Sequence, residues 1–204
     1  MSVCRVDFCL YLIIIHDTII INPYWSRRMN RKKIELDKFN TDIFKILNKG
    51  WMLLTSGDAV NGKGNTMTVS WGFMGTIWNK PVVIAAVRPQ RYTREFIEKY
   101  GNFTICSLPE DKKELLSFCG AHSGRDVDKI NECGLTMIPS EHISSPGFDE
   151  AELIIECRVT YKDEFKGGNF LDSKIISQCY PDSDFHHIYF GEVVNISGTD
   201  KYIA

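Results

Sequence analysis

Short apolar blocks alternate with polar turns along the chain, a pattern that favours strands over helices. Residues 66–73 alternate four apolar side chains with small polar ones, the period-two pattern of a strand with one buried face. Asn61 and Gly62 separate this strand from an apolar run at 51–56, and such a dipeptide between two strand patterns predicts a hairpin. Further strands are predicted at 81–88, 103–108, 151–161 and 185–196.

Short helices are predicted between these strands. Apolar residues recur at helical spacing in four segments, each closely followed by a glycine: 41–48, 94–100, 111–119 and 125–133. Thr93 is predicted to cap the second helix and Ser123 the fourth, and a weak pattern predicts a strand within 166–180. Because regular strand–helix–strand repetition is absent, the predicted fold is mainly β (α+β): an open or closed β-barrel with short inserted helices.

The N-terminal part departs from this pattern. Residues 8–21 form an apolar run that His16 and Asp17 interrupt, whereas a membrane-spanning helix needs about 20 apolar residues. Met29 begins an ordinary-looking start. The pattern therefore favours an upstream extension or a misassigned start over a signal peptide, a membrane anchor or an edge strand. The expected organisation is an extension at 1–37, which need not belong to the native fold, and one folded domain at 38–204.

Composition excludes several classes of protein. The chain has 204 residues, the length of one ordinary domain, and its 44% hydrophobic and 25% charged residues are typical of a globular protein. The formal net charge of -2 lacks the basic excess of a nucleic-acid-binding protein. The basic cluster within 27–33 is local and precedes the predicted domain.

Familiar catalytic motifs are also absent from the sequence. It contains no GxGxxG after a strand, no P-loop, no GxSxG and no HExxH, which disfavours a Rossmann domain and the enzymes those motifs mark. The seven cysteines include no CxxC pair, so neither a zinc site nor a thioredoxin-type pair is predicted. We interpret them as buried thiols in a reducing compartment, and no metal site is expected.

A first segment that could carry chemistry is the strand at 65–72. Its polar face offers the hydroxyls of Thr66, Thr68 and Ser70 beside backbone amides. A flat heteroaromatic ring with carbonyl and imide edges needs such a surface of small donors and acceptors. An ordinary strand whose hydroxyl face meets solvent has the same pattern, so this segment alone does not distinguish a ring-binding surface from such a strand.

A second segment, 87–96, has the chemistry of a phosphate site. Arg88 and Arg91 carry planar guanidinium groups suited to phosphate oxygens, and Pro89 forces a turn directly after a strand. Thr93 begins a helix, whose first N–H groups and dipole favour an anion. A solvated basic turn is the alternative interpretation.

A third segment, 119–129, combines a flexible loop with a cation. Gly120 and Gly124 permit a tight loop, and Lys129 follows on a helix that could approach a ligand. Asp126 and Asp128 would lie near the helix start, where carboxylates also stabilise the helix without any ligand.

A fourth segment, 184–192, contains adjacent histidines on a predicted strand. His186 and His187 point to opposite faces, so they cannot hold one metal ion together. A structural role for His186 is the alternative to ligand binding.

These segments occur in a recognisable order. The chain has the strand at 65–72, a turn with Gly75 and Trp78, the arginine segment, the glycine loop to Lys129, and a histidine strand ending at Gly191 and Glu192. In this order and spacing it resembles the flavin reductase-like (flavoredoxin-like) family between Trp51 and Glu192. The resemblance implies an FMN-binding split β-barrel and a homodimer with the flavin near the subunit interface.

The resemblance also implies which residues contact the flavin. On the strand these are Met67, Thr68, Val69 and Ser70, which would line the flavin ring largely through their backbone, with Thr66 from the hydroxyl face and Asn65 and Trp71 as secondary candidates. On the ribityl-phosphate side they are Arg88, Gln90, Arg91, Tyr92 and Thr93. The loop contributes Ser123, Gly124 and Lys129, and the last strand contributes His186. The segment before Tyr180 departs from the family pattern and leaves the substrate-side lid undefined.

The activity implied is an FMN-dependent oxidoreductase that transfers electrons from NAD(P)H to flavin or a small acceptor. Because the flavin carries the chemistry, no residue is assigned as a catalytic acid or base. The alternatives are an electron carrier with tightly bound FMN, served by a protein redox partner, and a non-catalytic flavin- or haem-binding module. A cytoplasmic protein is expected, without nucleic-acid or membrane partners.

Overall fold

The computed structural model describes residues 14–15, 18–19 and 29–204. Strands β1 (Ile14–Ile15) and β2 (Thr18–Ile19) pair with each other in a sheet of their own. Most of the apolar run at 8–21, and the start of the basic cluster, lie outside the described residues. Among the described helices, none is long and apolar enough to cross a membrane.

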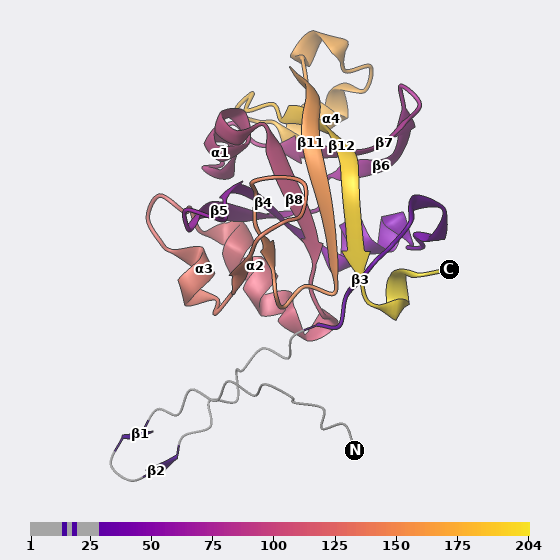
Figure 1. The fold of residues 1–204 in the computed structure, drawn as a ribbon. Coiled ribbons are helices and arrows are strands. Elements are labelled where there is room, and N and C mark those ends of the chain that lie inside the picture. Colours follow the sequence, from indigo (N-terminus) through magenta and orange to yellow (C-terminus); the bar gives the residue numbers. More distant parts are fainter. Residues whose placement is uncertain (1–13, 16–17, 20–28) are drawn as a thin grey trace.

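One antiparallel eight-stranded sheet forms the body of the domain (Figure 1). Its order is β5-β4-β8-β11-β12-β7-β6, with β3 added beside β12. The bounds are β3 Lys32–Lys33, β4 Met52–Asp58, β5 Lys63–Val69, β6 Gly72–Ile77, β7 Lys80–Val87, β8 Asn102–Ser107, β11 Leu153–Glu164 and β12 His187–Gly198. This sheet with its short helices confirms the mainly β prediction.

The hairpin predicted around Asn61 joins β4 to β5. Asp58 pairs with Lys63 across it, and Gly62 has a φ of 62°, the left-handed conformation that glycine adopts without strain. The Asp58 carboxylate accepts hydrogen bonds from the backbone and side-chain nitrogens of Asn61. The position and conformation of this hairpin turn are therefore predictable from the sequence.

The predicted single strand at 66–73 is wrong, because the chain breaks into two strands there. β5 ends at Val69 and β6 begins at Gly72. A Cβ on Gly72 would lie 2.5 Å from the Ile84 carbonyl oxygen, so the backbones approach too closely for a side chain at the bend. Trp71 and Phe73 consequently lie outside the core, 46% and 66% exposed.

Within residues 29–204, four α-helices are inserted between the strands: α1 (Thr93–Tyr100), α2 (Lys113–Ala121), α3 (Lys129–Glu132) and α4 (Ser173–Cys179). The predicted helix at 41–48 is present as a helical turn at 43–50 with π-helical geometry from Lys45 to Gly50. The remaining short elements are η1 Leu36–Lys38, η3 Glu110–Lys112, η4 Gly167–Asn169, η5 Asp200–Tyr202, β9 Met137–Ile138 and β10 Gly147–Phe148.

Two predicted helix caps are wrong. Thr93 lies in the first turn of α1, where its hydroxyl accepts a hydrogen bond from the Asn65 side chain at 2.6 Å. α3 begins only at Lys129, because the Asp128 carboxylate, rather than Ser123, caps it by accepting from the Asn131 backbone N–H at 3.2 Å. Residues 125–128 are therefore part of the loop.

The connection at 166–180 is helical, which corrects the predicted strand. Asp172 accepts from the Lys174 backbone N–H at 3.0 Å and caps α4. Ile175, Ile176 and Cys179 then follow at helical spacing. These side chains belong to a helix of about two turns, and so short a helical pattern is difficult to recognise in the sequence.

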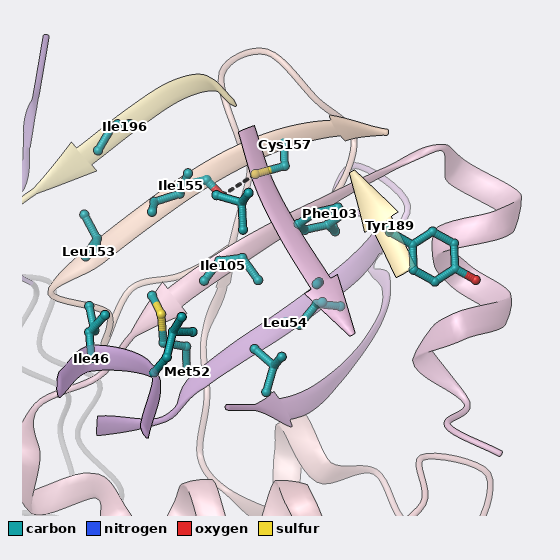
Figure 2. Close-up of a cluster of buried hydrophobic side chains, with 14 of the residues drawn as sticks. Ile46, Met52, Leu54, Phe103, Ile105, Leu153, Ile155, Cys157, Tyr189 and Ile196 are labelled. Carbon is teal, nitrogen blue, oxygen red and sulfur yellow. Dashed lines mark hydrogen bonds between the residues drawn. The ribbon is translucent and has the colours of Figure 1, made fainter. Parts of the chain in front are cut away.

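The main core fills the inside of the curved sheet (Figure 2). Met52 and Leu54 of β4 point into it, whereas Leu53 between them belongs to a second cluster that packs under α2. This alternation is the period-two pattern of a strand buried on both faces. Three of the five described cysteines, Cys106, Cys119 and Cys157, are buried free thiols, and burial raises the pKa of Cys106 to about 12.

Residues 29–37 of the predicted extension lie against the sheet. β3 pairs with Ser197 and Gly198 of β12, and Ile34 is 4% exposed in the main core. The Arg31 guanidinium donates to the carbonyl oxygens of Asp149 and Ala151 at 2.7 and 2.6 Å. In the structure, the chain thus joins the sheet before Lys38.

Candidate functional site

The arginine segment and the glycine loop, distant in sequence, line one cavity of about 640 Å³. β7 and α1 bring in the arginine segment, α2 and α3 bring in the loop, and the segment after α4 completes the wall. The lining residues are Met67, Arg88, Gln90, Arg91, Tyr92, Thr93, Gly120, Ala121, His122, Ser123, Gly124, Lys129, Gln178, Cys179, Pro181, Asp182 and Asp184. All eight predicted phosphate-side and loop residues therefore line this one cavity.

Lys129 is a buried cation at one end of this cavity. Its side chain starts α3, is 4% exposed, and donates to the Cys119 carbonyl oxygen at 3.1 Å. Burial lowers the pKa of Lys129, and the neighbouring Arg91 guanidinium lowers it further. No ion pair joins Lys129 to a carboxylate within the described part of the chain.

Arg91 is a second cation at the same end. Its guanidinium donates to the Gly120 carbonyl oxygen, which ties α1 to the end of α2. Burial, and then the charge of Arg88, lowers the pKa of Arg91. Because residues 29–204 supply no carboxylate in an ion pair with Arg91 or Lys129, this end of the cavity carries uncompensated positive charge that an anion would neutralise.

Arg88, by contrast, is engaged by the segment after α4. Its guanidinium donates to the Cys179 carbonyl oxygen at 2.6 Å, forms an ion pair with the Asp184 carboxylate, and lies 4.9 Å from the centre of the Tyr180 ring. Gln90 also donates to Asp184, at 3.1 Å. In the structure these two predicted phosphate ligands hold residues 179–184 in place.

Gly124 is required where the loop crosses the start of α1. A Cβ there would lie 1.8 Å from the Asn65 side-chain oxygen and 3.3 Å from the Tyr92 ring. Asn65 in turn donates to Thr93. The loop, β5 and α1 thus meet at one tightly packed point on the cavity wall.

The strand residues predicted beneath the flavin ring lie mostly outside the cavity lining. Met67 reaches the lining, but Thr66 is fully buried with its hydroxyl 2.8 Å from that of Thr55. The Thr68 hydroxyl donates to the Leu116 carbonyl oxygen of α2, and Val69 lies in the main core. Of the three hydroxyl-bearing residues on this strand, Thr66 is buried within the sheet, whereas Thr68 and Ser70 are half-buried.

The remaining strand candidates, Ser70 and Trp71, follow β5 and also lie outside the cavity lining. The Trp71 ring lies 5.0 Å from that of His186, between their centres. His186 is 6% exposed, and its Nδ1 is 2.9 Å from the Tyr180 hydroxyl oxygen. Burial, assisted by Arg88, lowers the pKa of His186 to about 4, so this imidazole is neutral at pH 7. Within the described residues, no three His, Cys, Asp or Glu side chains are grouped to hold a metal ion.

Sequence reasoning misses the wall formed by residues 178–184. Tyr180 is 2% exposed and links His186 to Arg88, yet the sequence marks it only as the end of an undefined lid. The available signal is Asp172, an N-cap residue ahead of a short apolar helical pattern. The contacts of Tyr180 depend on tertiary packing and carry no local signature.

Comparisons with known proteins bear on the family and the fold of the chain. Residues 44–202 match the family described as flavin reductase like domain. An uncharacterized protein of Pyrococcus abyssi is 27% identical over 130 residues, which is 62% of this chain and 73% of that protein.

Two solved structures share the fold. An FMN-binding domain of a flavin reductases-like enzyme from Shewanella baltica has a TM-score of 0.59 at 20% identity, covering 84% of this chain and 78% of its own. A protein of Shewanella frigidimarina described as having a split barrel domain has a TM-score of 0.58 at 19% identity, covering 82% and 76%. The predicted split β-barrel is therefore confirmed.

Proposed function

Because the chain belongs to the flavin reductase-like family, we propose that it binds FMN and transfers electrons from NAD(P)H to flavin or a small acceptor. The observation that carries this proposal is the pair of neighbouring cations, buried Lys129 and half-buried Arg91, at one end of the cavity. A buried charge without a partner destabilises a fold, and a phosphate group would supply the missing counter-charge.

The cavity fits FMN by size and by charge. Its volume of about 640 Å³ lies within the range of small-molecule sites, roughly 300–1,000 Å³. Lys129 and Arg91 would hold the phosphate, and Met67 and Tyr92 offer apolar contact to the rest of the molecule. When bound, the flavin supplies a hydride acceptor and one- or two-electron chemistry.

The chain's own residues would orient the cofactor and limit water access. The Arg88–Asp184 ion pair and the Arg88 bond to Cys179 hold residues 179–184 over one side of the cavity. Tyr180 and His186 support this wall from behind through their hydrogen bond. Because the His186 imidazole is neutral, it adds no second positive charge next to Arg88. The charges of Arg88 and Asp184 therefore still cancel within their ion pair.

The proposal includes a homodimer. Edge strand β6 and the residues flanking it, together with Tyr161 of β11, which contacts Trp78, present exposed apolar side chains: Trp71 46%, Phe73 66%, Ile77 38%, Trp78 52% and Tyr161 45%. Trp71 also contacts His186 behind the cavity wall, which would bring the subunit interface close to the flavin. A second copy of the chain would cover this surface.

The dimer is tested by light scattering of the wild type and two variants. Phe73→Glu should yield a monomer, because it adds a charge in the middle of the exposed apolar surface. Phe44→Glu alters a side chain that is 88% exposed on the helical turn at 43–50, and should leave the dimer intact. A wild-type monomer that holds flavin would contradict the dimer proposal.

The redox function is tested by a spectrum. The chain is expressed from Met29 and purified, its visible spectrum is recorded, and NADH or NADPH is added without oxygen. A yellow protein that bleaches supports a flavin-dependent reductase. A yellow protein that does not bleach supports an electron carrier that needs a protein donor. A colourless protein that also fails to bind added FMN would refute flavin binding.

The cellular setting follows from the cysteines. All five described cysteines are free thiols, three of them buried. Such thiols persist in reducing compartments, so we place the proposed activity in the cytoplasm. Mass spectrometry of the native protein, without reductant, would reveal any disulfide that contradicts this placement.

A further inference from the structure

Two thiols meet beside the positive end of the cavity. Cys119 lies in α2 and Cys133 directly follows α3, and their sulfur atoms are 3.7 Å apart. We propose that this pair is a redox-modification site, which a small-molecule disulfide such as oxidised glutathione converts from two thiols into one disulfide, and that the disulfide form binds the flavin phosphate less tightly. The effect on flavin rests on the proposed function, whereas the formation of the disulfide does not.

The two sulfurs are close enough to join after a small movement. A disulfide bond is about 2.05 Å long, so the sulfurs have to approach each other by roughly 1.7 Å. Cys119 is fully buried and Cys133 is half-buried, which means that an oxidant reaches the pair through Cys133. The buried thiols of Cys106 and Cys157 instead contact oxygen atoms, the Thr104 hydroxyl and the Ile155 carbonyl.

The exchange balances with the small disulfide as its one co-reactant. The Cys133 thiolate attacks one sulfur of the small disulfide, which releases one small thiol and leaves a mixed disulfide on Cys133. Cys119 then attacks the Cys133 sulfur and releases the second small thiol. The protein loses two electrons and two protons, and one small disulfide becomes two small thiols.

The resting form of the pair is the dithiol. Burial raises the pKa of both thiols, to about 12 for Cys119, although the Lys129 ammonium lowers both. Because the attacking thiolate is scarce at pH 7, the exchange is slow, and the pair stays reduced while small thiols are abundant. In a reducing compartment the disulfide would therefore form only when small disulfides accumulate.

Backbone hydrogen bonds connect this pair to both cations of the cavity. The Cys119 carbonyl oxygen accepts from the Lys129 ammonium, and that of the next residue, Gly120, accepts from the Arg91 guanidinium. On the other side, the Cys133 N–H donates to the Lys129 carbonyl oxygen at 3.1 Å. Drawing the two sulfurs together therefore shifts the end of α2 against α3. This shift moves Lys129 and Arg91 out of the arrangement that would meet the phosphate.

The experiment measures the FMN affinity of the full-length wild type by flavin fluorescence, before and after treatment with oxidised glutathione. Oxidation should weaken FMN roughly 10- to 150-fold, the effect of losing one hydrogen bond from a charged group. Peptide mapping by mass spectrometry should find Cys119 joined to Cys133. Reduction with dithiothreitol should restore the affinity.

Two variants separate this pair from the other cysteines. Cys133→Ser should keep the same FMN affinity with and without oxidised glutathione, and Cys133→Ala takes its place if the serine variant fails to fold by circular dichroism. Cys179→Ser changes a half-buried thiol outside the pair, so oxidation should still weaken its FMN binding as it does in the wild type.

Bound FMN should in turn favour the dithiol, because the two equilibria are linked. In titrations with mixtures of oxidised and reduced glutathione, saturating FMN should raise the reduction potential of the pair by about 30 mV for each tenfold loss of FMN affinity on oxidation. The absence of a Cys119–Cys133 disulfide at every ratio, or a disulfide that leaves FMN affinity unchanged, would overturn the inference. A wild type that binds no FMN in either form would instead refute the proposed function, and the peptide map would still decide whether the pair closes.

Discussion

Lys129→Met should have opposite effects on flavin binding and on the stability of the flavin-free protein. The methionine keeps much of the side-chain volume and removes the buried ammonium. A hydrogen bond to a charged group contributes about 1.5–3 kcal/mol, so FMN affinity should fall roughly 10- to 150-fold. This loss follows from the position of Lys129 at the uncompensated positive end of the cavity.

The flavin-free variant should nevertheless be more stable than the flavin-free wild type. Burial and Arg91 lower the pKa of Lys129, which means that the folded protein disfavours the charged form relative to the unfolded chain. The cost is present at pH 7 and diminishes as the pH rises from the folded-state pKa towards the ordinary value of 10.5. Removing this cost should therefore raise the free energy of unfolding and the Tm of the flavin-free protein, with each 1 kcal/mol corresponding to roughly 2–4 °C for a domain of this size.

Thermal denaturation of the flavin-free proteins and FMN titration measure the two effects. Lys162→Met is the matched control, since Lys162 is an exposed lysine on β11 and forms an ion pair with Glu98 away from the cavity lining. Lys162→Met should change neither the free energy of unfolding nor the free energy of FMN binding by more than about 0.5 kcal/mol. A lower Tm together with unchanged FMN affinity in Lys129→Met would refute the reasoning, because Lys129 would then be a structural cation.

Two further predictions concern the same region. Arg91→Ala should weaken FMN by about 1.5–3 kcal/mol in a titration, and unchanged affinity would mean that the phosphate binds elsewhere. His186 has a pKa of about 4 in the folded protein and 6.5 in the unfolded chain, so stability should decline as the pH falls from 6.5 to 4 while the unfolded chain takes up a proton. Measured by urea denaturation, the free energy of unfolding should decline less between pH 7 and 4.5 for His186→Gln than for the wild type. An equal decline in both proteins would show that His186 does not cause it.

The elements that are predictable from sequence are those with a complete local signature. The hairpin at Asn61 and Gly62 has its turn residues between two strand patterns, and α1 has a helical pattern with Gly101 in the left-handed conformation after it. The cavity wall at 119–129 is also predictable in outline. Gly120 and Gly124 indicate a tight loop between two predicted helices, and Lys129 supplies a cation close to it.

The elements that are not predictable depend on packing between distant segments. The hydroxyls of Thr66 and Thr68 could equally face a ligand, solvent or a helix, and only the position of α2 over β5 decides among these. Arg88 similarly has the sequence context of a phosphate ligand. Its actual partners, Cys179 and Asp184, come from a segment that lies more than ninety residues later.

The different partners of the three cations give the cavity an electrical direction. Arg88 is paired with Asp184 and donates to the Cys179 carbonyl oxygen, whereas Arg91 and Lys129 donate to carbonyl oxygens and have no ion-pair partner among residues 29–204. A ligand with one anionic end and one uncharged ring gains most when its phosphate lies beside Lys129 and its ring extends towards residues 179–184. Had Arg88 also been unpaired, it could compete with Arg91 and Lys129 for the phosphate. In the proposed complex, the Arg88–Asp184 ion pair would therefore help to set the orientation of the ligand.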